Sequence, residues 1–183
     1  MKVYIAQMNV VPGKPEENFK TMKAAVARAK KAGAEMVVFP DCAVSGNYRG
    51  LGSRNTEWAF QKPCRDTENA LEKLSKGIEI LMGCSEAFDV CMYNYYVNGE
   101  MNGWEHDFEV YSGLQQFTLD KDCEVDAVCG VFAKDNRKPV IYVNAVGTEN
   151  SGKNIYALDG ASRVYDANGK VAFRIEQFKA GEA

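Results

Sequence analysis

The feature that most constrains this chain is a short apolar run, Met36 to Phe39, which Pro40 closes and Asp41 follows. A run of that length with β-branched and aromatic residues predicts a strand that is buried on both faces. Because proline cannot donate to a sheet ladder, we expect strand pairing to end at Pro40. Asp41 then stands just beyond the carboxyl end of a central strand, where open α/β sheets hold their ligands. A carboxylate at that place is either a general base or the cap of the following turn.

The residues before this strand predict a βαβ unit. Residues 3 to 10 indicate a first, interior strand. Pro15 suits the first turn of a helix, apolar residues follow at helical spacing, and Gly33 ends the helix. A strand, a helix and a strand in this order favour an α/β fold with a right-handed crossover.

The rest of the chain alternates between strand and helix patterns without a repeat or a linker. We therefore expect residues 1–183 to form a single domain. The predicted elements are a loop over 45–62 that lines the site, a helix over 67–76, strands over 78–84 and 92–97, an Asn98-Gly99 turn, a helix over 122–134, a buried strand over 139–146, and a hairpin of 161–165 with 171–175. Residues 101 to 119 include several large apolar side chains, but their spacing fits neither a helix nor a strand.

Composition excludes several classes of function. The chain has 183 residues and a net charge of -3, and its acidic and basic residues are mixed along the sequence. This pattern offers no basic patch of the kind that binds nucleic acids or anionic membranes. No apolar run approaches the roughly 18 residues that span a bilayer, and the N-terminal stretch is too short and strand-like for a signal peptide. We expect a cytoplasmic protein.

The pattern of the six cysteines agrees with the reducing environment of the cytoplasm. Cys42, Cys64, Cys84, Cys91, Cys123 and Cys129 form no C-x-x-C pair, and the single histidine, His106, cannot complete a common zinc set. We expect most of them to be reduced and buried as small hydrophobic residues. The sequence therefore predicts no metal and no other cofactor.

Several segments, in this order, resemble the nitrilase superfamily of carbon–nitrogen hydrolases, most closely the glutaminase domain of glutamine-dependent NAD synthetases. The resemblance rests on Val3–Asn9 with Gly13 and Asn18, on Gly33–Pro40, on Tyr93-Asn94 with Asn98-Gly99-Glu100, on Pro139–Gly147, and on Asp159–Ser162 with Asp166–Lys170. It implies an α/β fold of the nitrilase-like αββα sandwich type, in an abbreviated form. It also implies a small amide substrate, and a homo-oligomer or a partner subunit.

The chemistry that this resemblance implies is amide hydrolysis by a Glu-Lys-Cys triad. A cysteine thiolate attacks the carbonyl, the glutamate moves the proton, and the lysine stabilises the developing oxyanion. Here Asp41 occupies the glutamate position with a side chain one methylene shorter, and a misplacement of about 1 Å can cost ~100-fold in rate. No lysine occurs between Lys76 and Lys121 to supply the cation, and His106 is the one group near the expected place that can become cationic.

The strand that would carry the nucleophile is not recognisable. The one segment that resembles it is Asp122-Cys123-Glu124. The interval from Cys123 to Pro139 is too short for the helix, strand and second helix that the family usually has there. Cys123 is still the first nucleophile candidate: a first helical turn lowers a thiol pKa, whereas neighbouring carboxylates disfavour the thiolate. Cys84, after the third predicted strand, is a second candidate, and Cys42 is interpreted as packing.

Three functions stay open on this basis. One is a small amidase or glutaminase with Asp41 as base and Cys123 or Cys84 as nucleophile. Another is a non-catalytic or weakly active homologue that uses the scaffold for binding or assembly. The third, a degraded product with no role beyond folding, fits less well because strand patterns, turn glycines and helix caps agree with one another. Because the three triad residues act as a unit, losing both the lysine and the nucleophile would nearly abolish catalysis. We therefore favour the second function, the non-catalytic or weakly active homologue.

Overall fold

The computed structural model describes all residues except 47–53, 84–89, 92–93, 97–105 and 151–153, and for 54–61, 90–91, 94–96 and 121 it describes the backbone alone. The first sheet has the strand order β12-β1-β2-β3-β5. Its three central strands, β1 (Val3–Gln7), β2 (Met36–Phe39) and β3 (Glu79–Gly83), are parallel. The two flanking strands, β5 (Asn94–Tyr96) and β12 (Gly181–Glu182), are antiparallel to their neighbours.

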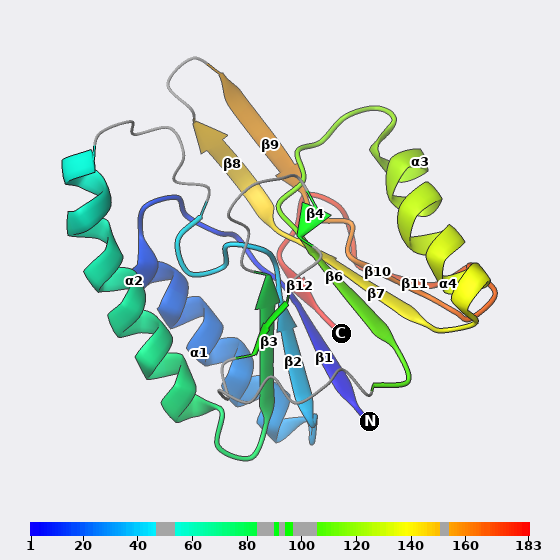
Figure 1. The fold of residues 1–183 in the computed structure, drawn as a ribbon, viewed down its shortest axis with the longest axis horizontal. Helices are drawn as coiled ribbons and strands as arrows, with labels where there is room; N and C mark the ends of the chain where they lie inside the picture. The colour runs from blue at the N-terminus through cyan, green and yellow to red at the C-terminus, as the bar shows by residue number, and fades with distance from the viewer. Residues whose placement is uncertain (47–53, 84–89, 92–93, 97–105, 151–153) are drawn as a thin grey trace.

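The second sheet has the order β11-β10-β7-β6-β4. Strands β6 (Glu109–Gly113) and β7 (Val140–Asn144) are parallel, and the others pair antiparallel with their neighbours. These are β4 (Val90–Cys91), β10 (Arg163–Tyr165) and β11 (Val171–Arg174). A separate antiparallel hairpin, β8 (Val146–Asn150) with β9 (Ile155–Asp159), projects beyond the two sheets (Figure 1).

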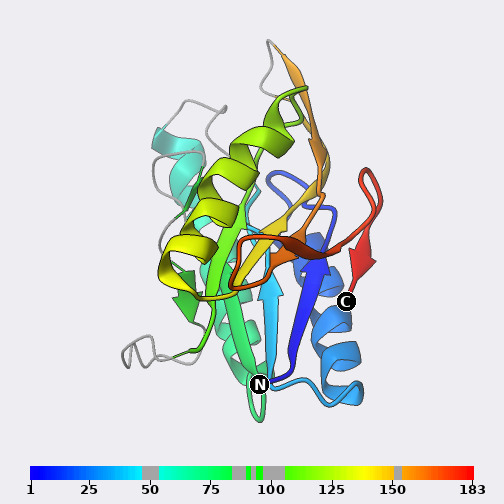
Figure 2. The same cartoon turned by 90° about the vertical axis from the view of Figure 1, so that its right-hand side faces the viewer.

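Helices cover the outer face of each sheet, so the molecule is an αββα sandwich (Figures 1 and 2). Helices α1 (Pro15–Lys31) and α2 (Arg54–Leu74) lie on the first sheet. On the second sheet lies one helical segment formed by α3 (Lys121–Val125), the π-helical turn Asp126–Gly130 and α4 (Val131–Asn136). In the described part of the chain no helix is both long and apolar enough to cross a membrane.

Three buried clusters fill the three spaces between these layers. Val37 and Phe39 face α1 and α2, whereas Met36 and Val38 face the second sheet. The third cluster joins the second sheet to the α3–α4 segment. All four residues of β2 are buried and the strand ends before Pro40, which confirms the prediction for this strand.

Most other predicted elements are confirmed: the first helix, the strand over 78–84, the helix over 122–134, the strand over 139–146 and the C-terminal hairpin. The predicted strand over 92–97 corresponds in part to β5, and the Asn98-Gly99 turn lies outside the described residues.

The loop predicted over 45–62 is wrong from residue 54 on, because α2 begins at Arg54 and continues through Pro63, whereas residues 47–53 lie outside the described part of the chain. Proline removes one intrahelical hydrogen bond, but packing against the first core cluster compensates for the loss. Cys64, Leu71 and Leu74 pack there at helical spacing.

Four strand regions had no sequence prediction: β6, the β8–β9 hairpin and the two-residue strands β4 and β12. β6 lies within the stretch that showed no period, and it ends in Ser112 and Gly113, two small residues that are buried although neither is hydrophobic. The β8–β9 hairpin was also missed, because β8 follows the buried β7 after one residue and looked like its continuation.

Candidate functional site

Asp41 lies where the carboxyl ends of three strands from both sheets meet. Its side chain is buried, and its backbone N–H donates to the carbonyl of Gly113 at the end of β6, at 3.2 Å. The next N–H, that of Cys42, donates to the carbonyl of Gly83 at the end of β3 and to Asp41 Oδ1, at 3.3 and 2.8 Å. The carboxylate is therefore held at the junction of the two sheets, just beyond the carboxyl end of β2 as the sequence predicts.

Gly83 makes the room that this carboxylate needs. A Cβ on Gly83 would lie 2.8 Å from Asp41 Oδ1, 2.8 Å from the Cβ of Ser112 and 3.0 Å from the Cα of Asp41. Ser112 is itself fully buried, and its hydroxyl donates to the carbonyl of Phe39 at 3.1 Å. Asp41, Gly83 and Ser112 thus form one closely packed group that draws on β3, β6 and the turn after β2.

The turn after β2 is strained at Cys42. This half-buried cysteine has a φ of 50°, in the left-handed region that few residues other than glycine adopt. Such a conformation costs of order 1–3 kcal/mol and occurs mostly at functional sites, where the surrounding structure enforces it. Here the two hydrogen bonds of the Cys42 amide enforce it.

A buried polar network at the end of β7 borders this group. Asn144 Oδ1 accepts the backbone N–H of Gln115 at 2.9 Å, and its Nδ2 donates to the carbonyls of Gln115 and Gly160 at 3.1 and 3.2 Å. The Tyr142 hydroxyl donates to Gln115 Oε1 at 2.8 Å, and burial raises the pKa of Tyr142 well above its ordinary value. The network holds the loop after β6 in place. Sequence reasoning missed it, although polar residues inside the apolar run of β7 were a usable signal.

Cys123 lies on the other side of the second sheet. It is exposed on α3, within the segment that covers the outer face of that sheet, whereas Asp41 lies at the junction of the two sheets. The structure therefore does not bring the predicted base and the predicted nucleophile together.

The aspartates beside Cys123 bind arginines. Asp122 accepts from Arg163 at 2.6 Å and from Arg174 at 3.0 Å, and Asp126 accepts from Arg163 at 3.1 Å. Partial burial would raise the pKa of Asp122, but the hydrogen bonds and charges of Arg163 and Arg174 outweigh it and lower that pKa. Since Arg163 is fully buried, these contacts anchor the helical segment to the sheet.

The comparisons with known proteins agree with this architecture. The sequence model of one family, described as carbon–nitrogen hydrolase, matches residues 2–127. This chain belongs to the carbon–nitrogen hydrolase family. No curated protein sequence matches it significantly.

Solved structures of a glutamine-dependent NAD+ synthetase and of an amidase share its fold. The glutamine-dependent NAD+ synthetase from Acinetobacter baumannii superposes with a TM-score of 0.73 at 16% identity, covering 99% of this chain and 44% of that one. The NitN amidase from Neterenkonia sp. AN1 superposes with a TM-score of 0.73 at 15% identity, covering 100% of this chain and 91% of that one. This chain thus spans less than half of the synthetase and most of the amidase, and at these identities the likeness concerns the fold.

The three cysteines not yet described and His106 differ in their surroundings. Cys84 is outside the described residues, whereas the backbone of Cys91 pairs with Ser112, one residue before Gly113. Burial raises the pKa of Cys129 to about 12. His106 Nε2 lies 3.5 Å from Glu79 Oε2, at the start of β3, whereas Asp41 adjoins the end of β3, about 13 Å further along that strand. His106 is therefore at the wrong end of the sheet to replace the family's lysine.

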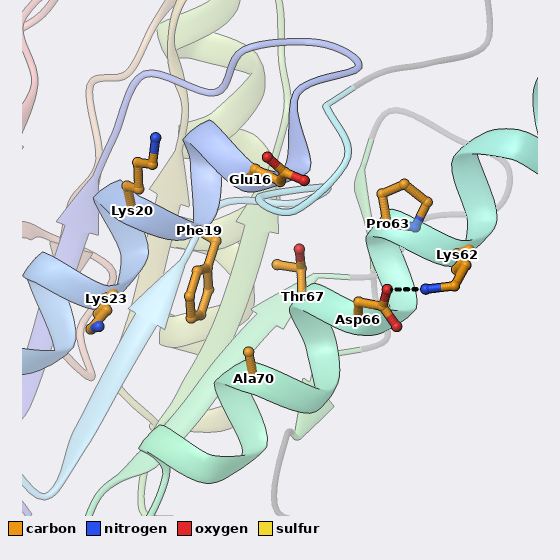
Figure 3. Close-up of a pocket in the computed structure, with 9 residues that line it drawn as sticks. All are labelled: Glu16, Phe19, Lys20, Lys23, Lys62, Pro63, Asp66, Thr67 and Ala70. Carbon is orange, nitrogen blue, oxygen red and sulfur yellow. Dashed lines mark hydrogen bonds and ion pairs between the residues drawn. The ribbon is translucent and has the colours of Figure 1, made fainter.

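A cavity of about 560 Å³ lies elsewhere, between α1 and α2 (Figure 3). Phe19 on α1 faces Thr67 and Ala70 on α2 across it, and Lys62 pairs with Asp66 at its edge, at 2.6 Å. The remaining lining residues are Glu16, Lys20, Lys23 and Pro63. None of the lining residues is a cysteine, and the groove lies on the outer side of the first sheet, so it is separate from Asp41. Within the described ranges no three His, Cys, Asp or Glu side chains gather as a metal site.

Proposed function

We propose that this chain is a carbon–nitrogen hydrolase homologue with a degenerate triad, non-catalytic or weakly active, whose scaffold serves binding or assembly. The observation that carries the proposal is the separation of Asp41 from Cys123 by the second sheet. The sequence adds that no lysine occurs between Lys76 and Lys121. Amide hydrolysis needs a base, a cation for the oxyanion and a nucleophile at one place, and their effects on rate are not additive.

The position of Asp41 itself supports this proposal. The carboxylate is buried, and one of its oxygens accepts the Cys42 amide. This hydrogen bond from a backbone N–H holds the oxygen in one orientation. Asp41 thus has a structural task in the turn, in agreement with its interpretation as a cap. A cytoplasmic location belongs to the same proposal, supported by the free thiols of Cys64, Cys123 and Cys129.

The second candidate function is an active small amidase or glutaminase, and one observation favours it. The register pairs the backbone of Cys91 with Ser112, next to the residue whose carbonyl accepts the Asp41 amide. In that reaction a cysteine thiolate attacks the amide carbonyl and the C–N bond breaks. The leaving nitrogen takes the proton that Asp41 has accepted from the cysteine thiol. Water then attacks the thioester while Asp41 accepts its proton, and the C–S bond breaks to release the carboxylic acid and the thiolate.

The deciding experiment is stoichiometric labelling with a diazo-ketone analogue of glutamine, followed by intact mass and peptide mapping. The analogue alkylates an activated thiol at a glutamine site. Under the proposal, any labelling occurs slowly, at exposed thiols such as Cys123, and excess glutamine does not reduce it.

Three variants make the result interpretable. Cys123→Ser removes the exposed thiol, Cys91→Ser tests the alternative nucleophile, and Asp41→Asn removes the base while keeping an oxygen that accepts the Cys42 amide. One adduct that glutamine blocks, and that is lost in Asp41→Asn and in a single cysteine variant, would contradict the degenerate-triad proposal. It would establish the amidase and identify its nucleophile.

A further inference from the structure

The groove between α1 and α2 takes no part in the site at Asp41, and it has the size of a small-molecule site (Figure 3). Its volume of about 560 Å³ lies within the roughly 300–1,000 Å³ that such sites occupy. Phe19, Pro63 and Ala70 form the apolar part of its lining, which we call the apolar wall. Small-molecule sites combine a wall of this kind with a few polar groups that orient the ligand.

The hydroxyl of Thr67 is one such polar group, and it is buried without a partner. Thr67 is 5% exposed, and its hydroxyl makes no hydrogen bond to the residues that the structure describes. A threonine inside a helix often donates to the carbonyl four residues earlier, as Thr21 of α1 does to Glu17 at 3.5 Å. The Thr67 oxygen instead points away from its own helix, into the gap between α1 and α2 (Figure 3). Since buried polar groups are nearly always hydrogen-bonded, this hydroxyl is a donor that a ligand in the groove would satisfy.

The charges that line the groove leave one positive charge in excess. Lys62 and Asp66 pair at 2.6 Å and neutralise each other. The other charged lining residues are Glu16, Lys20 and Lys23, which are two cations and one anion. A ligand with a single negative charge therefore complements this lining, whereas a cationic ligand would add to the excess.

Lys20 and Lys23 are placed to attract that negative charge. Both come from α1, as Phe19 does, and both are exposed (Figure 3). Neither forms an ion pair with any residue in the described part of the chain. The flexible four-carbon stem of a lysine lets its charge turn toward an anion without a change in the helix. Glu16 opposes an anion, but it lies in the first turn of α1, where the positive end of the helix dipole offsets its charge.

We propose that the groove between α1 and α2 binds a small organic anion with a flat apolar body, such as an aryl carboxylate. The body packs against the apolar wall, the anionic group accepts a hydrogen bond from the Thr67 hydroxyl, and Lys20 and Lys23 attract its charge. This site is independent of catalysis at Asp41, because the groove lies on the outer side of the first sheet and has no cysteine in its lining.

Fluorescence titration of the intact chain with two dyes tests the proposal. Anilinonaphthalene sulfonate has a flat apolar body with an anionic group, and phenylnaphthylamine has the same body without a charge. Over about 1 to 100 µM dye, the wild type should bind the sulfonate dye about fivefold or more tightly than the neutral dye. Naphthoate, a carboxylate with a similar body, should displace the sulfonate dye.

Two changes separate the hydrogen bond from the charge. Thr67→Val keeps the size of the side chain and should weaken the sulfonate dye about fivefold, the effect of one hydrogen bond to a charged group, without changing the neutral dye. Lys20→Gln combined with Lys23→Gln should remove the preference for the sulfonate dye. The matched controls Thr21→Val and Lys31→Gln change α1 outside the groove lining and should bind both dyes as the wild type does.

Ala70→Phe tests the place of binding, because its ring fills the groove and should abolish binding of both dyes. A wild type that binds neither dye, or binds both equally, would overturn the proposal. So would a Thr67→Val variant that binds the sulfonate dye as Thr21→Val does, or a folded Ala70→Phe variant that still binds it. Circular dichroism melting shows which variants are folded, and Thr67→Val preserves the packing if Ala70→Phe does not fold.

Discussion

At the scale of single residues, Gly83 is the position near the candidate site where the packing requires a glycine. Its missing side chain leaves the space that Asp41 Oδ1 and the Cβ of Ser112 occupy. Sequence reasoning found Asp41, because a proline and an acid directly follow an apolar run. It could not find Gly83, because only the pairing of β2 with β3 and the stacking of the two sheets bring these residues together.

We expect Gly83→Ala to lower the free energy of unfolding by about 3 kcal/mol, because the new methyl group meets backbone and buried side chains that have no room to move. Urea unfolding measures the loss. The matched control is Gly33→Ala, where φ is 70° but no atom lies within 4 Å, so only the backbone strain of about 1 kcal/mol applies. Equal losses in the two variants would contradict the close packing around Asp41.

At the scale of elements, the α3–α4 segment depends on Arg163 for its place on the second sheet. The sequence predicts this helix from its apolar spacing, and it interprets the nearby acids only as groups that disfavour a Cys123 thiolate. In the structure Asp122 and Asp126 bind an arginine that comes from β10, about forty residues later in the chain. Partners so far apart in sequence leave no local pattern, so the pairing was not predictable.

The lowered pKa of Asp122 makes this anchoring dependent on pH. Its pKa is 3.8 when unperturbed and lies below that value in the folded chain, so its stabilising contribution is complete at about pH 7 and is lost as pH falls through the folded pKa. We expect Asp122→Asn to be less stable than the wild type at about pH 7, with a difference that shrinks on acidification below 3.8.

Urea unfolding at a series of pH values measures this difference. The control is Asp135→Asn, which changes an aspartate of the same segment that makes no ion pair with the described residues. A wild-type advantage over Asp122→Asn that stays constant down to low pH would show that the ion pairs do not contribute.

At the scale of the whole molecule, the sequence predicts the helices and strands that have a regular hydrophobic pattern better than those that lack one. The buried run of β2, the helix before it and the C-terminal hairpin carry local periods that burial on one or two faces imposes. The start of α2, strand β6 and the β8–β9 hairpin lack such a period. In β6, Ser112 serves a contact with a distant part of the chain, because its hydroxyl donates to the carbonyl of Phe39 in β2.

Gln7 is the clearest such contact, since it joins three distant parts of the fold. This buried side chain of β1 accepts the backbone N–H of Ser162 at 2.8 Å and donates to the carbonyls of Glu176 and Lys179, both at 2.8 Å. It thus connects the first sheet to the start of β10 and to the C-terminal segment that returns as β12. No residue pattern within β1 indicates these partners.

We expect Gln7→Ala to lower the free energy of unfolding by about 3 kcal/mol, because three backbone groups lose their partner and at least the Ser162 amide is buried. Hydrogen exchange should accelerate most over residues 176–179, which lose the Gln7 side chain as a partner while β12 stays paired with β1. Gln116→Ala is the matched control, because the Gln116 side chain makes no hydrogen bond to the described residues. A loss within about 0.5 kcal/mol of that control would show that the two sheets hold the C-terminal segment without Gln7.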